Sequence, residues 1–182
     1  RLLSAAEERV LLADLNRPER TYAAPVAVHA LFRRQAERTP DTAAPVGPRG
    51  AMTYRELAGR SAALAARLPH RLDVRVGLLA DPDPQVLVGM LGILEAGAGF
   101  VPLDPRAPDE RLSWLLEDAA CEVVVTQTRY RERLAGLGVR TVREVLCLED
   151  ALPDGTEPRL RASGEPRSLA YVVYTSGSTG RP

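Results

Sequence analysis

Hydroxyl residues and glycines gather in one run near the end of the chain. Four hydroxyl residues and two glycines fill six consecutive positions, namely Thr175, Ser176, Gly177, Ser178, Thr179 and Gly180. Glycines let the backbone turn its N–H groups inward, and hydroxyl groups add further donors without bulk. Such a loop can form a concave site for an anion, in particular a chain of phosphates. These six residues are therefore the candidate nucleotide-binding residues.

Two other interpretations of this run are a flexible Gly/Ser linker and a plain surface turn. The apolar run Leu169–Tyr174 directly precedes it and predicts a final strand, at whose carboxyl end a ligand would normally bind. This position, and the interleaving of glycine with hydroxyl residues, favour an anion site. For Gly177 and Gly180, shaping the loop and contacting phosphate are equally open.

Two common nucleotide motifs are excluded by spacing. The P-loop needs G-x-x-x-x-G-K-[ST], whereas Gly177 and Gly180 are three apart and the chain contains no lysine. A dinucleotide fingerprint needs a third glycine, which follows neither Gly97–Gly99 nor Gly136–Gly138 at the required distance.

Composition bounds the class of protein. With 182 residues, 45% of them hydrophobic, the chain can bury the core of one ordinary domain. Its 24 basic residues are balanced by 24 acidic ones, which argues against a nucleic-acid partner. We find no apolar run of membrane-spanning length and no signal peptide, and we expect a cytoplasmic protein. Cys121 and Cys147 have no zinc spacing and are expected to be free thiols.

The pattern of apolar residues predicts alternating strands and helices, and hence an α/β fold with a largely parallel sheet and flanking helices. Two capping boxes, Ser4–Glu7 and Thr53–Glu56, mark helix starts. We expect helices from residue 4 for about three turns and over 28–38, 54–68, 84–96, 109–119 and 130–135. Strands are expected at 74–79, 99–103, 122–126, 169–174 and, weakly, 139–142. Segments 16–25 and 153–166 are expected to be a linker and a loop, and 43–50 to be irregular or edge-like.

No catalytic side chain and no metal ligand is assigned from the sequence. Other polar residues have simpler explanations: Tyr54 and Glu56 serve capping and packing, Asp81, Asp83 and Asp104 belong to turns or caps, and Trp114 packs on its helix. His29 and His70 have no nucleophile or ligand partner nearby in the sequence.

Three segments, in order, resemble core motifs of one family. Leu169–Pro182 is similar to the phosphate-loop motif of the adenylation domains of nonribosomal peptide synthetases, in the adenylate-forming superfamily. Met52–Leu57 and Leu94–Pro105 resemble the first and second core motifs, and the opening resembles the linker between a condensation and an adenylation domain. The chain departs from the family at Met52 (usually Leu), Glu95 (usually Lys) and Gly99 (usually a larger small residue), and residues 68–72 lack the usual Gly-containing turn.

The resemblance implies an organisation: residues 1–25 are the condensation-to-adenylation linker, and 26–182 are the first part of the large N-terminal subdomain, truncated in the phosphate-binding loop. It implies activation of an amino or aryl acid by ATP as acyl-AMP, with release of pyrophosphate. The acyl group then passes to the phosphopantetheine thiol of a carrier domain. Partners would be an upstream condensation domain and a downstream carrier domain.

The resemblance places the substrate pocket, the catalytic lysine and the Mg²⁺ carboxylate downstream, so the fragment alone is expected to be inactive. Two alternatives stay open: an acyl- or aryl-CoA ligase of the same superfamily, and a non-catalytic docking or linker piece of a multidomain synthetase.

Overall fold

A computed structural model describes residues 3–14, 26–47, 50–69, 71–150 and 166–175. Its centre is a four-stranded parallel sheet with strand order β4-β3-β5-β6. The strands are β3 (Arg75–Leu79), β4 (Gly99–Leu103), β5 (Val123–Thr126) and β6 (Glu144–Cys147). In the register of the sheet, Gly77 of β3 pairs with Val101 on one side and Val124 on the other. The predicted α/β class with a parallel sheet is confirmed.

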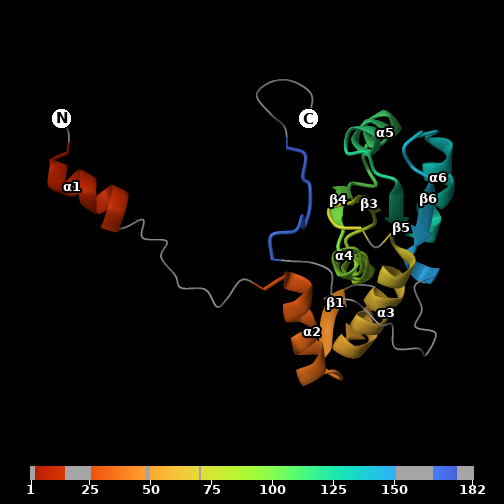
Figure 1. The fold of residues 1–182 in the computed structure, drawn as a ribbon, viewed down its shortest axis with the longest axis horizontal. Coiled ribbons are helices and arrows are strands. Elements are labelled where there is room, and N and C mark those ends of the chain that lie inside the picture. The colour runs from red at the N-terminus through yellow and green to blue at the C-terminus, as the bar shows by residue number, and fades with distance from the viewer. Residues whose placement is uncertain (1–2, 15–25, 48–49, 70, 151–165, 176–182) are drawn as a thin grey trace.

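Helices cover both faces of this sheet, and Figure 1 shows α4 and α5 on opposite sides of β3 and β4. On one face lie α3 (Tyr54–Arg67) and α4 (Gln85–Glu95), and on the other lie α5 (Asp109–Asp118) and α6 (Arg131–Gly136). The first face buries Leu64, Val88 and Ile93 completely. The second face is centred on Leu112 of α5 against Val101 and Val124 of the sheet. The central strands β3 and β5 are thus buried on both faces, whereas β4 at the edge of the sheet leaves Phe100 half-buried and Pro102 exposed.

The N-terminal elements begin where their capping residues predicted. Ser4 and Glu7 form a capping box at the start of α1 (Ala5–Arg9), which continues as the π-helical turn η1 (Val10–Asp14). The predicted second helix is α2 (Val28–Arg38). The second capping box, Thr53 with Glu56, begins α3. The expected linker 16–25 lies outside the described residues.

The segment expected to be irregular or edge-like forms a hairpin of β1 (Ala43–Gly47) and β2 (Gly50–Thr53), which pair antiparallel with a register shift. Of the two expectations for residues 43–50, irregular or edge-like, the structure therefore supports the edge-like one. This two-stranded sheet is separate from the parallel sheet.

The weak strand predicted at 139–142 is wrong, because the last strand of the sheet begins at Glu144. Both Arg143 and Glu144 donate their N–H groups to the carbonyl of Glu122, which aligns the chain with β5 only from that point. The buried positions are Leu146 and Cys147, so burial rather than the β-propensity of Val139 and Val142 decides which residues enter the sheet.

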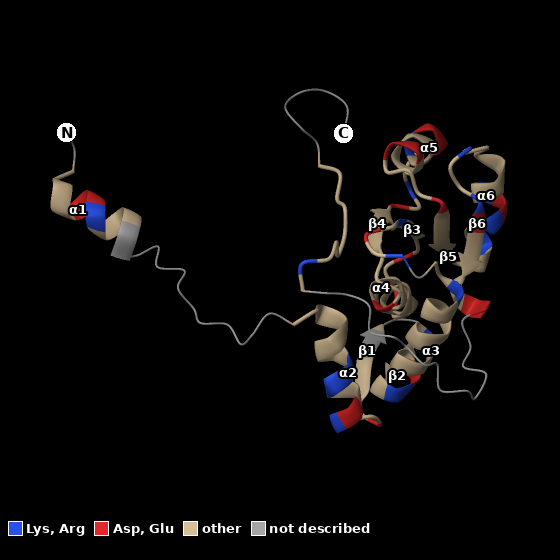
Figure 2. Ribbon diagram, in the orientation of Figure 1, with Lys and Arg blue, Asp and Glu red and all other residues tan. Residues whose placement is uncertain are grey.

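Short helical turns complete the described chain: η2 (Thr128–Tyr130) follows β5 and η3 (Leu148–Asp150) follows β6. The expected loop 153–166 lies outside the described residues except for Pro166. No helix within the described ranges is long and apolar enough to cross a membrane. Charged residues are distributed over the helices, whereas residues 168–175 include none (Figure 2).

Candidate functional site

Of the six candidate nucleotide-binding residues, the structure describes Thr175, whose side chain is exposed. Ser176, Gly177, Ser178, Thr179 and Gly180 lie outside the described residues, and their role stays a prediction. The described part of the site is therefore residues 169–175, which we call the approach segment because it leads the chain into the hydroxyl-and-glycine run.

The approach segment is anchored at its start by a backbone hydrogen bond and by close packing. The Leu169 N–H donates to Asp73 Oδ1 over 2.7 Å. Asp73 itself has a left-handed backbone with φ 59°, which an aspartate tolerates better than most residues. The Leu169 side chain covers Gly99 so closely that a Cβ there would lie 2.7 Å from Leu169 Cγ. Gly99, one of the departures from the family motif, thus makes room for the approach segment.

The approach segment was predicted to be a full strand, and this prediction is wrong. It makes a single parallel bridge, in which Phe100 N–H donates to the Ala170 carbonyl and Val172 N–H donates to the Phe100 carbonyl. The next donor along β4 would be Pro102, which has no N–H. The ladder therefore stops after one bridge, although Phe100 and Tyr171 still pack with ring centroids 5.7 Å apart.

Tyr174, the residue before Thr175, is held by helix α5. Its hydroxyl donates to Asp118 Oδ2 over 2.5 Å, and its ring meets the Trp114 ring edge-on at 5.5 Å. Burial and the hydrogen bond to Asp118 raise the pKa of Tyr174 to about 12, so the phenol stays protonated and keeps its donor. Asp118 ends α5, and the tyrosine hydroxyl thus reaches towards the turn that leads into β5.

Packing was the role predicted for Trp114, and the structure confirms it and adds Tyr174 as a partner. The role of Asp118 was missed in the sequence. The available signal was its spacing of four residues from Trp114 on one helix, which places both side chains on one face.

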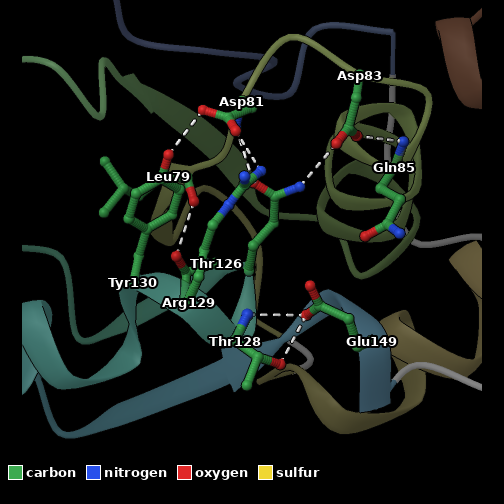
Figure 3. A network of polar contacts seen from close by, with 10 residues as sticks. Leu79, Asp81, Asp83, Gln85, Thr126, Thr128, Arg129, Tyr130 and Glu149 are labelled. Carbon is green, nitrogen blue, oxygen red and sulfur yellow. Dashed lines mark hydrogen bonds and ion pairs between the residues drawn. The ribbon is translucent and has the colours of Figure 1, made fainter. Parts of the chain in front are cut away.

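A second group of polar side chains lies where β3 and β5 end (Figure 3). Gln127 is its centre, with the side chain accepting from Asp81 N–H at 3.0 Å and donating to Asp83 Oδ2 at 2.8 Å. Tyr130 Oη donates to Asp81 Oδ1 at 2.7 Å, and Arg129 forms an ion pair with Asp81. Gln127 is buried, and its importance was missed in the sequence although a polar residue directly after a valine strand was visible.

This polar network lies at the switch point of the sheet. Helix α4 connects β3 to β4 on one side, and the chain then crosses over through α5 to β5 on the other side of β3. Ligands of α/β proteins often bind at such a point. Here, however, the groups of the network bind one another, and Asp83 also accepts from the Gln85 N–H at 2.8 Å at the start of α4. The predicted turn role of Asp81 and Asp83 agrees with these contacts, but the N-cap residue of α4 is Pro84 and not Asp83 as predicted. The network joins the loops that follow β3 and β5.

Both cysteines are buried free thiols, as predicted. Burial raises the pKa of the Cys121 thiol to about 11, so the reactive thiolate is scarce at neutral pH.

Comparison with known proteins agrees with the fold and with the motif order. The family model described as AMP-binding enzyme matches residues 32–182, most of the chain. The chain belongs to the AMP-binding enzyme family. This AMP-binding chain is 43% identical to the AMB antimetabolite synthetase AmbB of Pseudomonas aeruginosa, over 99% of the chain and 14% of that protein. It is 37% identical to tyrocidine synthase 3 of Brevibacillus parabrevis, over 100% of the chain and 3% of that protein.

Solved structures give the same result for this member of the AMP-binding family. The nonribosomal peptide synthetase FmoA3, in a crystal structure described as its AMPPNP-bound form, matches 95% of the chain and 18% of its own, with a TM-score of 0.83 and 29% identity. The resemblance to synthetase adenylation domains is therefore confirmed. The AMP-binding chain spans between 3% and 14% of the length of the curated relatives named here.

Proposed function

We propose that this chain is the first part of an adenylation domain that activates an amino or aryl acid for nonribosomal peptide synthesis. In this proposal residues 26–182 open the large subdomain, and residues 1–25 connect it to a preceding condensation domain. The observation that carries the proposal is the likeness, over 95% of the chain, to a synthetase structure described with bound AMPPNP. The Thr-Ser-Gly-Ser-Thr-Gly run supports it from the sequence.

The chemistry divides into two steps. A carboxylate oxygen of the acid attacks the α-phosphorus of ATP, forming acyl-AMP while the bond to the pyrophosphate oxygen breaks. The thiol of a carrier phosphopantetheine then attacks the acyl carbon, and AMP leaves. The task of residues 175–180 is to offer N–H and O–H donors to the β- and γ-phosphates, whose charge grows as pyrophosphate departs.

Mg²⁺ would supply further charge stabilisation, but its ligands are expected elsewhere. Within the described ranges no group of three or more His, Cys, Asp or Glu side chains could hold a metal ion. As part of this proposal, the Mg²⁺ carboxylate is expected in a later part of the full-length protein.

The linker role of residues 1–25 is supported by apolar side chains on the first helical segment. Leu3, Val10 and Leu12 are 45%, 44% and 70% exposed, which is unusual for large aliphatic residues on one short segment. A neighbouring domain would bury them. We place the protein in the cytoplasm, where its carrier and condensation partners would act on ATP-activated acids.

The test is ATP–pyrophosphate exchange by the complete adenylation domain with a panel of amino and aryl acids. We expect exchange with one acid or a narrow group, and a Thr175→Val variant should lose at least about ten-fold in kcat/KM for ATP because a donor is removed from the loop. The 182-residue chain alone should show no exchange. Acid-dependent formation of a CoA thioester would instead support the CoA-ligase alternative, and no exchange with any acid would support the non-catalytic one.

A further inference from the structure

The approach segment depends on side chains for its position because its backbone pairing is so limited. It makes one bridge to Phe100, and Pro102 prevents the next. In its middle, Tyr171 and Val173 are 58% and 54% exposed, whereas Val172 between them packs against the core beneath α5. Two contacts beyond the bridge hold its ends: Leu169 N–H on Asp73, and Tyr174 on α5.

The contact at Tyr174 is the one adjacent to the candidate nucleotide-binding residues. Trp114 and Asp118 are four residues apart and lie on one face of α5. The Trp114 ring meets the Tyr174 ring at 5.5 Å with an interplanar angle of 74°, an edge-on geometry that aromatic pairs prefer. Asp118 Oδ2 accepts a hydrogen bond from the Tyr174 hydroxyl with an O···O distance of 2.5 Å, the length of a charge-assisted O–H···O bond.

We propose that Trp114 and Asp118 are positioning residues for ATP binding, which act by holding Tyr174 and so determining where the chain enters the phosphate loop at Thr175. This inference rests on the proposed function. Neither residue is expected to touch ATP. Both residues contact Tyr174, and Thr175 follows Tyr174 directly in the chain. Their effect therefore reaches Thr175 through Tyr174.

If Tyr174 only packed against Trp114, a phenylalanine ring would serve equally well. Removing the hydroxyl therefore distinguishes a packing role of Tyr174 from a positioning role. Tyr174→Phe keeps the contact with Trp114 and removes only the hydrogen bond to Asp118. Asp118→Ala removes the acceptor, whereas Asp118→Asn keeps an oxygen that can accept. The matched control is Tyr171→Phe, a tyrosine three positions earlier whose ring packs on Phe100 instead.

The experiment measures ATP–pyrophosphate exchange in the complete adenylation domain, with KM determined separately for ATP and for the acid. Tyr174→Phe and Asp118→Ala should each raise KM for ATP about three- to ten-fold, the effect of losing one hydrogen bond, with KM for the acid unchanged. The double variant should be no worse than either single one, because both remove the same bond. Asp118→Asn and Tyr171→Phe should stay within about two-fold of the unmodified domain.

Three results would overturn the inference. They are an unchanged KM for ATP in both single variants, an equal rise of both KM values together with a lower melting temperature, and effects of the two variants that simply add. Each of these leaves the proposed function intact as long as the unmodified domain exchanges and Thr175→Val shows the expected loss in kcat/KM for ATP. Absence of exchange in the unmodified domain overturns the proposed function, and with it the premise of this inference.

Discussion

Arg33 of α2 lies 3.0 Å from Glu95 at the end of α4, through Arg33 Nη2 and Glu95 Oε2. The Glu95 side chain is 1% exposed, whereas that of Arg33 is 35% exposed. Neither carboxylate oxygen accepts a well-formed hydrogen bond from the described residues. The pair is therefore a close contact between charged groups, in which the attraction to Arg33 only partly offsets the cost of burying the Glu95 carboxylate.

The first prediction concerns pH. Burial raises the pKa of Glu95 from 4.5 to about 7, and the charge of Arg33 opposes this shift without cancelling it. Between pH 4.5 and 7 the folded chain holds a proton on Glu95 that the unfolded chain has released. The free energy of unfolding should thus fall as pH rises through this window, by on the order of 3 kcal/mol.

Glu95→Gln should remove this part of the pH dependence, because an amide does not titrate. Denaturant unfolding of the two chains at intervals from about pH 5 to 8 measures the slopes. Glu117→Gln, on the exposed surface of α5, is the matched control and should keep the slope. Parallel curves for the unmodified chain and Glu95→Gln would contradict the prediction.

The second prediction is that the two charges of the Arg33–Glu95 pair can be exchanged between the residues. The family usually has a lysine at the position of Glu95. The variant Glu95→Lys therefore tests whether Arg33 must be replaced as well. Alone, the substitution places a buried cation beside Arg33 and should lower the free energy of unfolding by about 3–5 kcal/mol. Adding Arg33→Glu restores opposite charges and should recover most of that loss.

A thermal-melting cycle of the two single variants and the double variant gives the coupling energy of the charge-pair substitutions. If the double variant is as unstable as the sum of the singles, then Arg33 and Glu95 do not act as a pair.

The third prediction concerns the contact between α3 and α4. A Cβ at Gly92 would lie 2.9 Å from the Ser61 carbonyl oxygen and 3.0 Å from Leu64 Cβ. These are backbone and near-backbone atoms of a helix, which cannot move aside alone. Gly92→Ala should therefore destabilise the chain by about 1–3 kcal/mol, in spite of the better helix propensity of alanine.

Gly136→Ala, at the end of α6, is the control for Gly92→Ala, because a Cβ there meets no atom within 4 Å. This variant should be neutral or slightly more stable. Melting curves of both variants suffice, and a Gly92→Ala chain as stable as Gly136→Ala would show that the two helices leave room for a methyl group.

The fourth prediction concerns the polar network at the ends of β3 and β5. Gln127→Leu removes the bonds to Asp81 N–H and Asp83 Oδ2 while keeping a side chain of similar size. We expect a loss of about 1–3 kcal/mol in the free energy of unfolding, because buried polar groups lose partners.

Arg106→Ala provides the comparison, since the Arg106–Asp104 ion pair is exposed to solvent and its removal should leave the melting temperature almost unchanged. Equal melting temperatures for the two variants would mean that the network does not order the loops.

The sequence alone determined those elements whose cause is local. Both capping boxes formed as predicted, because their hydrogen bonds join residues three apart in the chain. The strands β3, β4 and β5 and the helices between them followed from continuous apolar runs, and the order of three motifs was enough to indicate the family. The candidate loop residues also came from the sequence, and they remain its prediction beyond Thr175.

Tertiary structure decided everything that depends on a partner far along the chain. Whether residues 169–174 form a strand depended on Pro102, a residue of the neighbouring strand that cannot donate. The start of the last strand depended on the carbonyl of Glu122, and the partner of Tyr174 on the end of α5. The partner of Glu95 came from α2, 62 positions earlier. Local propensity cannot contain such information, because each of these contacts exists only after the intervening chain has folded around the sheet.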